Sequence, residues 1–295
     1  MNIFITGSTG FVGNNVINYF KSNHTFSIYK RKNKITINDN VILHLAGKAH
    51  DLKNVSSFDE YYKVNTELTK EVFDAFLTSE AKVFITLSSV KAVADEVDGE
   101  LTEDLTPNPI THYGKSKLLA EQYILSKPIP DGKRVYILRP CMIHGPGNKG
   151  NLNLLYSLVS KGLPWPLGLF QNSRSYLSIE NLCFIIMELI NREEIPSGVY
   201  NVADDVPLST NQVINMIAES NGKKACILNL SLKIIKIFAL VGDFLKLPLN
   251  SERLQKLTES YVVSNAKIKS VLGKPLPVSS KDGLMRTFQS FADNV

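Results

Sequence analysis

Short, nearly continuous apolar runs alternate with longer stretches of helical periodicity through the first two thirds of the chain. Such runs are typical of strands in a parallel sheet that is covered on both faces. Apolar residues also recur at helical spacing from residue 57 to 77, which predicts one long helix between two strands. This alternation predicts an α/β fold with a doubly wound parallel sheet and right-handed crossovers. The predicted strands are residues 2–5, 26–29, 34–37, 41–45, 82–87, 134–138 and 199–202.

The pattern becomes irregular and rich in Pro and Gly after "HGPGNKGN" and through "KGLPWPLGLFQ". A change of this kind indicates that the chain leaves the alternating unit. We therefore expect two lobes. The larger α/β domain takes residues 1–145 and 176–203, and a smaller, mixed lobe takes residues 146–175 and 204–295.

Residues 232–245, "LKIIKIFALVGDFL", are the most hydrophobic later stretch. Lys233, Lys236 and Asp243 interrupt this segment, and it is too short to cross a bilayer. It predicts an amphipathic helix rather than an integral membrane segment. Packing against its own lobe is the favoured interpretation, and a peripheral membrane or subunit contact is the alternative.

Composition indicates an ordinary globular protein, with 295 residues of which 44% are hydrophobic. The net charge of +5 is modest and spread along the chain, so anionic small ligands are favoured as partners over nucleic acid. The three cysteines lie far apart without a C-x-x-C pair, so we expect buried thiols in a reducing compartment. His50, His112 and His144 lack metal-ligand spacing, so no metal site is expected. The first residues lack a secretory pattern, which favours a cytoplasmic protein.

The stretch "TGSTGFVG" places three glycines three residues apart, directly after the first strand and at the start of a helix. Glycine there permits a tight turn and close approach of the backbone to a pyrophosphate, whose charge the helix N-terminus favours. A merely structural turn is the alternative. With "VILHLAG" as a later strand end, the context favours dinucleotide binding in a Rossmann-type domain. The residues expected to contact the cofactor in this loop are Gly7, Thr9, Gly10, Phe11, Val12 and Gly13.

Tyr113 and Lys117 of "YGKSK" stand one helical turn apart, so their side chains share a face. Taken alone, this pair is more typical of a solvated helix that carries an amphipathic tyrosine. However, "TGSTGFVG", "HLAGKAH", "VNTEL", "TLSS", "YGKSK" and "LRPCMIHGPG" occur in the order and approximate spacing of the extended short-chain dehydrogenase/reductase family, which the chain resembles nearly from end to end. Through "SSVKAVADE", "KGNLNLL" and "NSRSYLSIENL" it resembles bacterial nucleotide-sugar epimerases and reductases, particularly those that reduce UDP-4-keto-6-deoxy-N-acetylhexosamines for capsule or O-antigen sugars.

The resemblance implies a catalytic set. Tyr113 would exchange a proton with the sugar oxygen while hydride passes between the sugar carbon and the nicotinamide. Because a free phenol has a pKa of about 10, the adjacent Lys117 ammonium and the oxidised nicotinamide would have to favour phenolate. Ser89 would hydrogen-bond the same substrate oxygen. Asn65 matches the family's helix-distorting asparagine, which helps to complete a proton relay.

The resemblance also implies further cofactor contacts. Lys117 would hold the nicotinamide ribose, and Leu45, Ala46, Gly47 and Pro140 would also lie at the cofactor. Members of the family that prefer NAD usually have an acidic residue at the end of the second strand, to accept the adenosine ribose hydroxyls. This chain has "SIYKRKNK" there. Its three consecutive basic residues are Lys30, Arg31 and Lys32. They would neutralise a 2′-phosphate and so favour NADPH over NADH. A solvated basic turn without a cofactor contact is the alternative.

The two residues directly after the active-site serine bear on the reaction and the substrate. Related 4,6-dehydratases have Asp and Glu there, whereas this chain has Val90 and Lys91, which argues against dehydration. Lys91 is either solvated or faces the substrate. Trp165 either lines a uracil pocket or packs within its lobe. The remaining residues that the resemblance places at the nucleotide sugar are Ser88, Ser89, Tyr113, Asn151, Leu152, Arg174 and Arg253.

Together these features predict a cytoplasmic reductase that uses NADPH to reduce the C4 keto group of a UDP-linked 4-keto-6-deoxy-N-acetylhexosamine. A homodimer is compatible with the resemblance. The competing hypothesis is a UDP-sugar 4-epimerase that keeps NAD bound. A third hypothesis, a regulatory protein that binds cofactor without catalysis, conflicts with the intact Ser, Tyr and Lys set.

Overall fold

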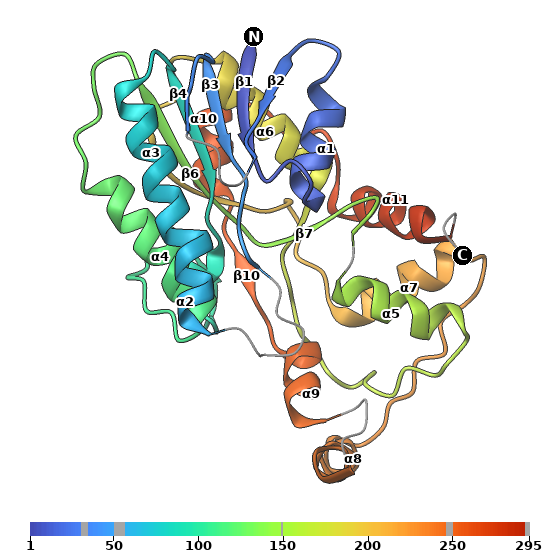
Figure 1. Ribbon diagram of the computed structural model, residues 1–295. Helices are drawn as coiled ribbons and strands as arrows, with labels where there is room; N and C mark the ends of the chain where they lie inside the picture. Colours follow the sequence, from blue (N-terminus) through green and yellow to red (C-terminus); the bar gives the residue numbers. More distant parts are fainter. Residues whose placement is uncertain (31–34, 50–56, 149, 246–249, 293–295) are drawn as a thin grey trace.

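The computed structural model describes residues 1–30, 35–49, 57–148, 150–245 and 250–292. A six-stranded sheet forms its centre, in the order β2-β1-β3-β4-β6-β9, with every neighbouring pair parallel (Figure 1). This arrangement confirms the predicted Rossmann-type α/β fold. The strands are β1 (Asn2–Thr6), β2 (Thr25–Ile28), β3 (Val41–His44), β4 (Val83–Leu87), β6 (Arg134–Pro140) and β9 (Gly198–Val202).

One predicted strand is wrong. Residues 35–37 form no strand, and Lys34 lies outside the described residues. Ile35 and Ile37 instead pack, partly buried, against one of the sheet's cores. The chain must leave the edge strand β2 and re-enter the sheet beyond β1, where Asn40 donates to the carbonyl of Asn2 at 3.0 Å. The short run therefore crosses between strands without pairing with one.

Helices cover both faces of the sheet. Successive residues of β1 point to opposite sides, so Ile3 and Ile5 enter one core and Phe4 enters the other. The first core is closed by α1 (Phe11–Phe20), α6 (Ile179–Asn191) and α10 (Ala266–Leu272). The second is closed by α3 (Leu68–Thr78) and α4 (His112–Leu125). α10 falls in the stretch that the sequence analysis assigned to the smaller lobe, yet it packs on the sheet.

The long helix predicted for residues 57–77 forms with a distortion at its centre. It begins as α2 (Phe58–Tyr61), continues as the π-helical segment η1 (Tyr62–Glu67) and ends as α3. A π-helical turn adds a residue to the helix and is often found at functional sites. Asn65 lies inside this segment, as expected of a helix-distorting asparagine.

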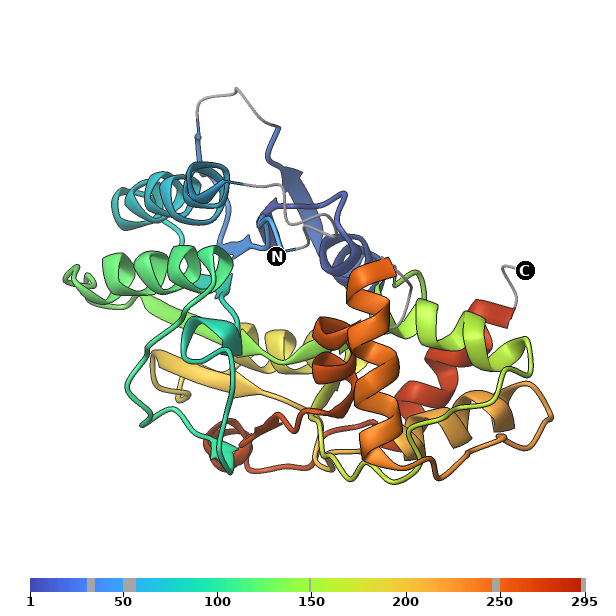
Figure 2. The same cartoon turned by 90° about the horizontal axis from the view of Figure 1, so that it is seen from below.

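The smaller lobe gathers around a separate hydrophobic core, and most of it lies to the right in Figures 1 and 2. Its helices are α5 (Asn151–Ser160), α7 (Thr210–Ser220), α8 (Leu232–Leu245), α9 (Ser251–Thr258) and α11 (Ser280–Ala292). One short parallel pair, β5 (Glu100–Leu101) with β10 (Val262–Val263), joins it to the larger domain. A second, β7 (Met142–His144) with β8 (Tyr176–Ser178), belongs to the larger domain and packs against α11. Among the described residues, no helix has the length and apolar character needed to span a bilayer.

Candidate active site

The carboxyl ends of β1, β3, β4 and β6 meet at the lower edge of the sheet in Figure 1. Ligands of open α/β sheets bind at this edge. Because the strands are parallel, it brings together segments that are far apart in the sequence: the glycine loop after β1, Leu45 to Gly47 after β3, and Ser88 and Ser89 after β4. Pro140, at the end of β6, is buried beside Val202.

Ser89 and Tyr113 come from different elements that approach very closely. Ser89 caps the short 3-10 helix η2 (Val90–Ala92), where its Oγ accepts a hydrogen bond from the amide of Lys91 at 3.2 Å. A Cβ on Gly114 would clash with the Lys91 carbonyl oxygen, so only glycine lets α4 pack against η2 at this point. The glycine that follows Tyr113 therefore sets the distance between the tyrosine and the serine.

The start of α4 is fixed by a carboxylate. Asp95 accepts hydrogen bonds from the amides of Ile110 and Thr111, at 2.6 and 3.0 Å, and from the Thr111 hydroxyl at 2.9 Å. Thr111 in turn caps α4 by accepting from the amide of Gly114 at 3.2 Å. These bonds satisfy helix N-terminal groups and hold Tyr113 at the first turn.

Tyr113 is half-buried and forms a hydrogen bond with Ser89. Burial raises the pKa of the Tyr113 phenol above its usual value, and the hydrogen bond with Ser89 acts in the opposite direction. Tyr113 is therefore protonated near neutral pH in the protein alone. This state suits a proton donor.

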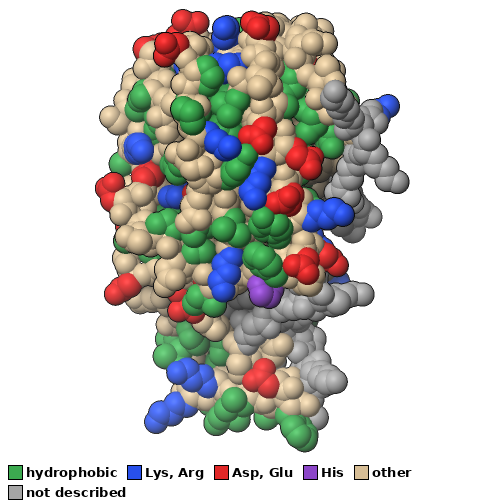
Figure 3. Space-filling view, turned by 60° about the vertical axis from the view of Figure 1, so that its left-hand side comes forward, with side chains coloured by type: hydrophobic (Ala, Val, Ile, Leu, Met, Phe, Trp, Pro, Cys, Tyr) green, Lys and Arg blue, Asp and Glu red, His purple; other side chains and the backbone are tan. Residues whose placement is uncertain are grey.

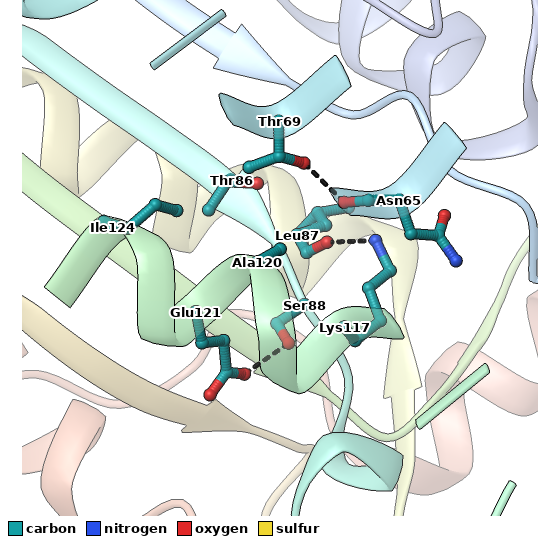
Figure 4. Close-up of a pocket in the computed structure, with 9 residues that line it drawn as sticks. All are labelled: Asn65, Thr69, Thr86, Leu87, Ser88, Lys117, Ala120, Glu121 and Ile124. Atoms are coloured by element: carbon teal, nitrogen blue, oxygen red, sulfur yellow. Dashed lines mark hydrogen bonds between the residues drawn. The ribbon is translucent and has the colours of Figure 1, made fainter. Parts of the chain in front are cut away.

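Lys117 lies one turn further along α4 and is 7% exposed. Its Nζ donates to the backbone carbonyl of Leu87 at 2.7 Å, as Figure 4 shows. Burial lowers the pKa of Lys117 to about 8, while the Glu121 carboxylate acts to raise it. A Cβ on Gly47 would lie 3.1 Å from Lys117 Nζ and 3.3 Å from Asn65 Oδ1, so these three residues meet.

A buried ion pair that the sequence analysis missed lies behind Lys117. Glu121 is 1% exposed and accepts two hydrogen bonds from Arg139 Nε, at 3.0 and 3.2 Å, and a third from its guanidinium at 2.5 Å. Ser88 also donates to Glu121 (Figure 4). The structure thus directs the Ser88 hydroxyl towards Glu121, whereas that of Ser89 meets Tyr113.

Asn65 joins three parts of the site. It is fully buried, its Oδ1 accepts from the Lys48 amide at 2.7 Å, and its Nδ2 donates to the Lys48 carbonyl and to Ser116 Oγ, each at 3.0 Å. Ser116 lies on α4 and donates to the carbonyl of Tyr113 at 2.8 Å. Asn65 therefore ties the π-helical segment to the strand end after β3 and to the helix that carries Tyr113.

His44 is a second residue that the sequence analysis overlooked. Its ring lies 2.8 Å from both Thr6 Oγ1 and Thr69 Oγ1. Thr69 donates to the Asn65 carbonyl at 2.7 Å, so it accepts from His44, and the other ring nitrogen accepts from Thr6. Burial lowers the pKa of His44 to about 3, so the ring is neutral. A chain of hydrogen bonds thus connects the π-helical segment with the end of β1.

The glycine loop fits a dinucleotide. Gly7 has a φ of +73° and a Cβ there would lie 2.6 Å from the Ala46 nitrogen, while a Cβ on Gly13 would clash with the Gly7 carbonyl. Gly10 caps α1 without a side-chain hydrogen bond, and no described residue supplies a capping side chain. The amides at the start of α1, those of Phe11 and Val12, are therefore suited to a pyrophosphate. Thr9 is exposed beside them.

The structure describes only part of the basic stretch that follows β2. Lys30 is exposed just beyond the strand, which suits contact with a charged ligand. Arg31 and Lys32 lie outside the described residues, so the predicted contact with a 2′-phosphate stays a prediction.

On the substrate side, the structure brings Lys91 and Arg174 near the same carboxylate, Glu259. Arg174 forms an ion pair with Glu259 at 3.4 Å. Lys91 Nζ donates to the Asp95 carbonyl at 2.6 Å and lies 4.0 Å from the centre of the Tyr261 ring. Burial lowers the pKa of Lys91, and the charge of Glu259 opposes this effect. Lys91 is thus half-buried against Tyr261 instead of fully solvated. The sequence analysis had not identified Glu259 or Tyr261 as neighbours of this lysine.

Other predicted substrate residues lie in the smaller lobe. Leu152 is 4% exposed in its core, at the start of α5, where Asn151 begins the helix. Arg253 lies on α9. Trp165 is 6% exposed in the same core and donates from Nε1 to Asn211 at 3.1 Å, which supports lobe packing. Cys226 is exposed, which corrects the expectation that every thiol is buried.

Comparison with known proteins agrees with this geometry. Residues 3–203 match the model of the family described as "NAD dependent epimerase/dehydratase family". The chain belongs to that family. The match confirms the resemblance to extended short-chain dehydrogenases/reductases and identifies the chain as a relative of NAD(P)-dependent nucleotide-sugar epimerases and reductases.

Two curated relatives show the range of this family. The chain is 31% identical to a UDP-glucose 4-epimerase of Vibrio cholerae over 98% of its own length and 95% of the relative. It is 29% identical to the N-acetyl-alpha-D-glucosaminyl-diphospho-ditrans,octacis-undecaprenol 4-epimerase of Escherichia coli O157:H7, over 85% of the chain and 77% of the relative.

Among solved structures, RMD from Pseudomonas aeruginosa complexed with NADPH has a TM-score of 0.76 and 20% identity, covering 100% of this chain and 99% of that one. This likeness shows the fold. Within the described residues, no group of three or more His, Cys, Asp or Glu side chains is placed to hold a metal ion.

Proposed function

We propose that the protein reduces the C4 keto group of a UDP-4-keto-6-deoxy-N-acetylhexosamine with NADPH, giving a UDP-6-deoxy-N-acetylhexosamine such as UDP-N-acetylfucosamine or UDP-N-acetylquinovosamine. A bound reduced nicotinamide supplies the hydride that adds to C4. Tyr113 donates its phenolic proton to the C4 oxygen, so that a carbonyl becomes a secondary alcohol. Ser89 donates a hydrogen bond to the same oxygen and polarises the carbonyl. The Lys117 ammonium stabilises the phenolate that remains.

The observation that carries this proposal is the hydrogen bond between Tyr113 and Ser89, at a position where burial raises the pKa of the phenol. A reductase begins its chemical step with a proton donor, and burial keeps the phenol in that form. The positions after Ser89 support reduction over dehydration, because Val90 is apolar and buried and Lys91 is engaged with Asp95. The basic residues from Lys30 to Lys32 favour NADPH.

The other substrate contacts complete the proposal. Arg174 and Lys91 would supply positive charge to the diphosphate, which the start of α5 at Asn151 and Leu152 would also meet. The product would serve surface polysaccharide synthesis in the cytoplasm, where UDP-sugars are made, and a homodimer is compatible with this role.

The direct test is incubation with the product pool of a 4,6-dehydratase and NADPH, followed by identification of the sugar that is consumed and of its product. We expect NADPH oxidation in proportion to a UDP-6-deoxy-N-acetylhexosamine. The rate of NADPH oxidation with this pool should exceed the rate with UDP-glucose or UDP-N-acetylglucosamine. On those two sugars the enzyme should act slowly or not at all.

The second candidate is a 4-epimerase, which the two curated relatives favour by their names. Such an enzyme retains its cofactor and returns the same hydride, so the purified protein would carry NAD and interconvert UDP-hexoses without net loss of NADPH. Tight cofactor binding with no turnover of any candidate sugar would instead support a regulatory protein.

A further inference from the structure

Helix α8 buries only a narrow stripe of its described side chains. Ile235 and Ala239 are each 1% exposed and enter the core of the smaller lobe, and Gly242 is buried in line with them. Residues three and four apart share one face of a helix. The sequence analysis favoured packing of this helix against its own lobe. The buried stripe makes that contact, and it leaves the other sides of the helix uncovered by the described part of the lobe.

The rest of α8 presents large apolar side chains to solvent. At 100° per residue, positions 240, 244, 237, 241, 234 and 238 follow one another around an arc of about 160°. Phe244 is 87% exposed, and apolar side chains of this size gathered on one surface mark an interaction site. The outer face of α8 is defined by Ile234 (46% exposed), Ile237 (60%), Phe238 (57%), Leu240 (63%), Val241 (44%) and Phe244.

The charges on α8 are unbalanced. Lys233 and Lys236 are exposed at its N-terminal half, and no ion pair joins either of them to a carboxylate among the residues that the structure describes. Asp243, the acidic residue of the helix, is engaged, because it accepts from the amide of Ser251 at 2.9 Å and from its hydroxyl at 2.5 Å. The outer face of α8 therefore combines exposed apolar side chains with two cations that no carboxylate of the described residues pairs with.

The position of α8 suits contact with a flat surface. In Figures 1 and 3 the helix forms the lower end of the molecule, beyond the edge of the sheet where the strands end, and hydrophobic and basic side chains appear together there. Figure 2 shows the helix along its length, in front of the two lobes. Its outer face can approach a plane without obstruction from the larger domain.

We propose that α8 docks the enzyme on an anionic membrane surface, with the outer face of α8 inserted among the lipid headgroups and with Lys233 and Lys236 against lipid phosphates. Amphipathic helices with basic residues beside the apolar face bind in this way, and their binding rises with buried apolar area and with anionic lipid. The site at the ends of the strands then faces the bilayer. The docking depends on α8 alone and holds whichever sugar nucleotide the enzyme uses.

Charge favours a lipid surface over a second copy of the chain. A symmetric contact between two α8 helices would bring the uncompensated lysines of both copies to one interface. An anionic bilayer neutralises them instead.

The test is flotation of the full-length protein with vesicles of phosphatidylcholine, alone or mixed with phosphatidylglycerol. We expect binding to the mixed vesicles that falls with added salt. Lys233→Gln and Lys236→Gln should each weaken it about fivefold, since a basic residue near the surface contributes about that factor. Phe238→Ser with Phe244→Ser should remove it. Leu125→Ser is a matched control, because Leu125 is 61% exposed on α4, and it should bind normally.

Circular dichroism and cofactor binding verify that each variant is folded. Unchanged activity on soluble sugar nucleotides in the α8 variants, together with lost vesicle binding, supports the proposal. Absence of binding to mixed vesicles by the unmodified protein would overturn it. So would a dimer that Phe238→Ser with Phe244→Ser converts to monomer while vesicle binding is unaffected.

Discussion

Lys117 Nζ donates to the carbonyl of Leu87 at 2.7 Å, which fastens the helix that carries Tyr113 to the strand that leads into Ser89. The bond explains how a lysine with little solvent contact is held within the site. Burial lowers the pKa of Lys117 to about 8, so its charge changes within a pH range in which the enzyme can be assayed.

The alkaline limb of kcat/KM should therefore reflect Lys117. Below pH 8 the ammonium is present and can support cofactor and phenolate. As pH rises through about 8 in the free enzyme the charge is lost, so kcat/KM should fall. Because Glu121 acts to raise this pKa, Glu121→Gln should move the limb to lower pH.

Glu194→Gln is the control, because Glu194 pairs with Arg192 on the surface and its loss should leave the limb in place. Glu121→Gln should also destabilise the fold by about 3 kcal/mol, since Arg139 then stays buried without its partner. Thermal unfolding measures that cost. An alkaline limb at the same pH in both variants would mean that Glu121 does not act on Lys117.

Tyr113→Phe should lower turnover by about 100-fold or more and leave sugar and cofactor binding nearly intact, because only the proton transfer is lost. Lys117→Met should weaken cofactor binding as well. Steady-state kinetics with cofactor titration separates the two effects. Near-normal turnover in Tyr113→Phe would remove the central role assigned to it.

Gly114→Ala should be costly, because the new Cβ would press on the Lys91 carbonyl, which is backbone and cannot move aside. We expect a loss of about 1 to 3 kcal/mol in the free energy of unfolding. We also expect lower kcat, because η2 and Ser89 would be displaced from Tyr113. Gly198→Ala is the control substitution. The nearest atom to its new Cβ would be 3.8 Å away, an ordinary van der Waals contact, so the protein should tolerate it. Equal stability of the two variants would show that the close approach is not needed.

Arg31→Ala tests the choice of cofactor. If the basic stretch after β2 binds the 2′-phosphate, the variant should lose about 1 to 3 kcal/mol of NADPH binding and little NADH binding, because NADH lacks the group that forms the charge-assisted contact. Fluorescence titration with each cofactor measures this difference. Equal losses for both would show that Arg31 does not recognise the phosphate.

The sequence predicted the parts of the site that depend on local spacing. Tyr113 and Lys117 share a face because of helical periodicity, and the glycine loop follows its strand in a pattern that fixes its geometry. The helix from residue 57 to 77 was predicted by its apolar spacing. Its π-helical turn was expected only through the resemblance of Asn65, since periodicity does not distinguish one extra residue in a turn.

Other features depend on contacts between distant segments. Glu121 and Arg139 pair across two elements, and His44 meets Thr69 and Thr6 only after the sheet and helix assemble. Residues 34–37 alternate in sequence like a strand, but residues 35–37 pair with no strand in the described part of the chain. The exposure of the outer face of α8 could not be predicted either. Apolar spacing predicts an amphipathic helix, but it does not show which side of the helix the rest of the protein covers.

The most direct test of the proposed function follows the hydride. With NADPH deuterated at the transferred position and a UDP-4-keto-6-deoxy-N-acetylhexosamine, we predict one NADPH oxidised for each sugar reduced, with deuterium at C4 of the product. Interconversion of UDP-hexoses with retained NAD, no deuterium in the sugar and no net loss of NADPH would contradict the account and make the enzyme an epimerase.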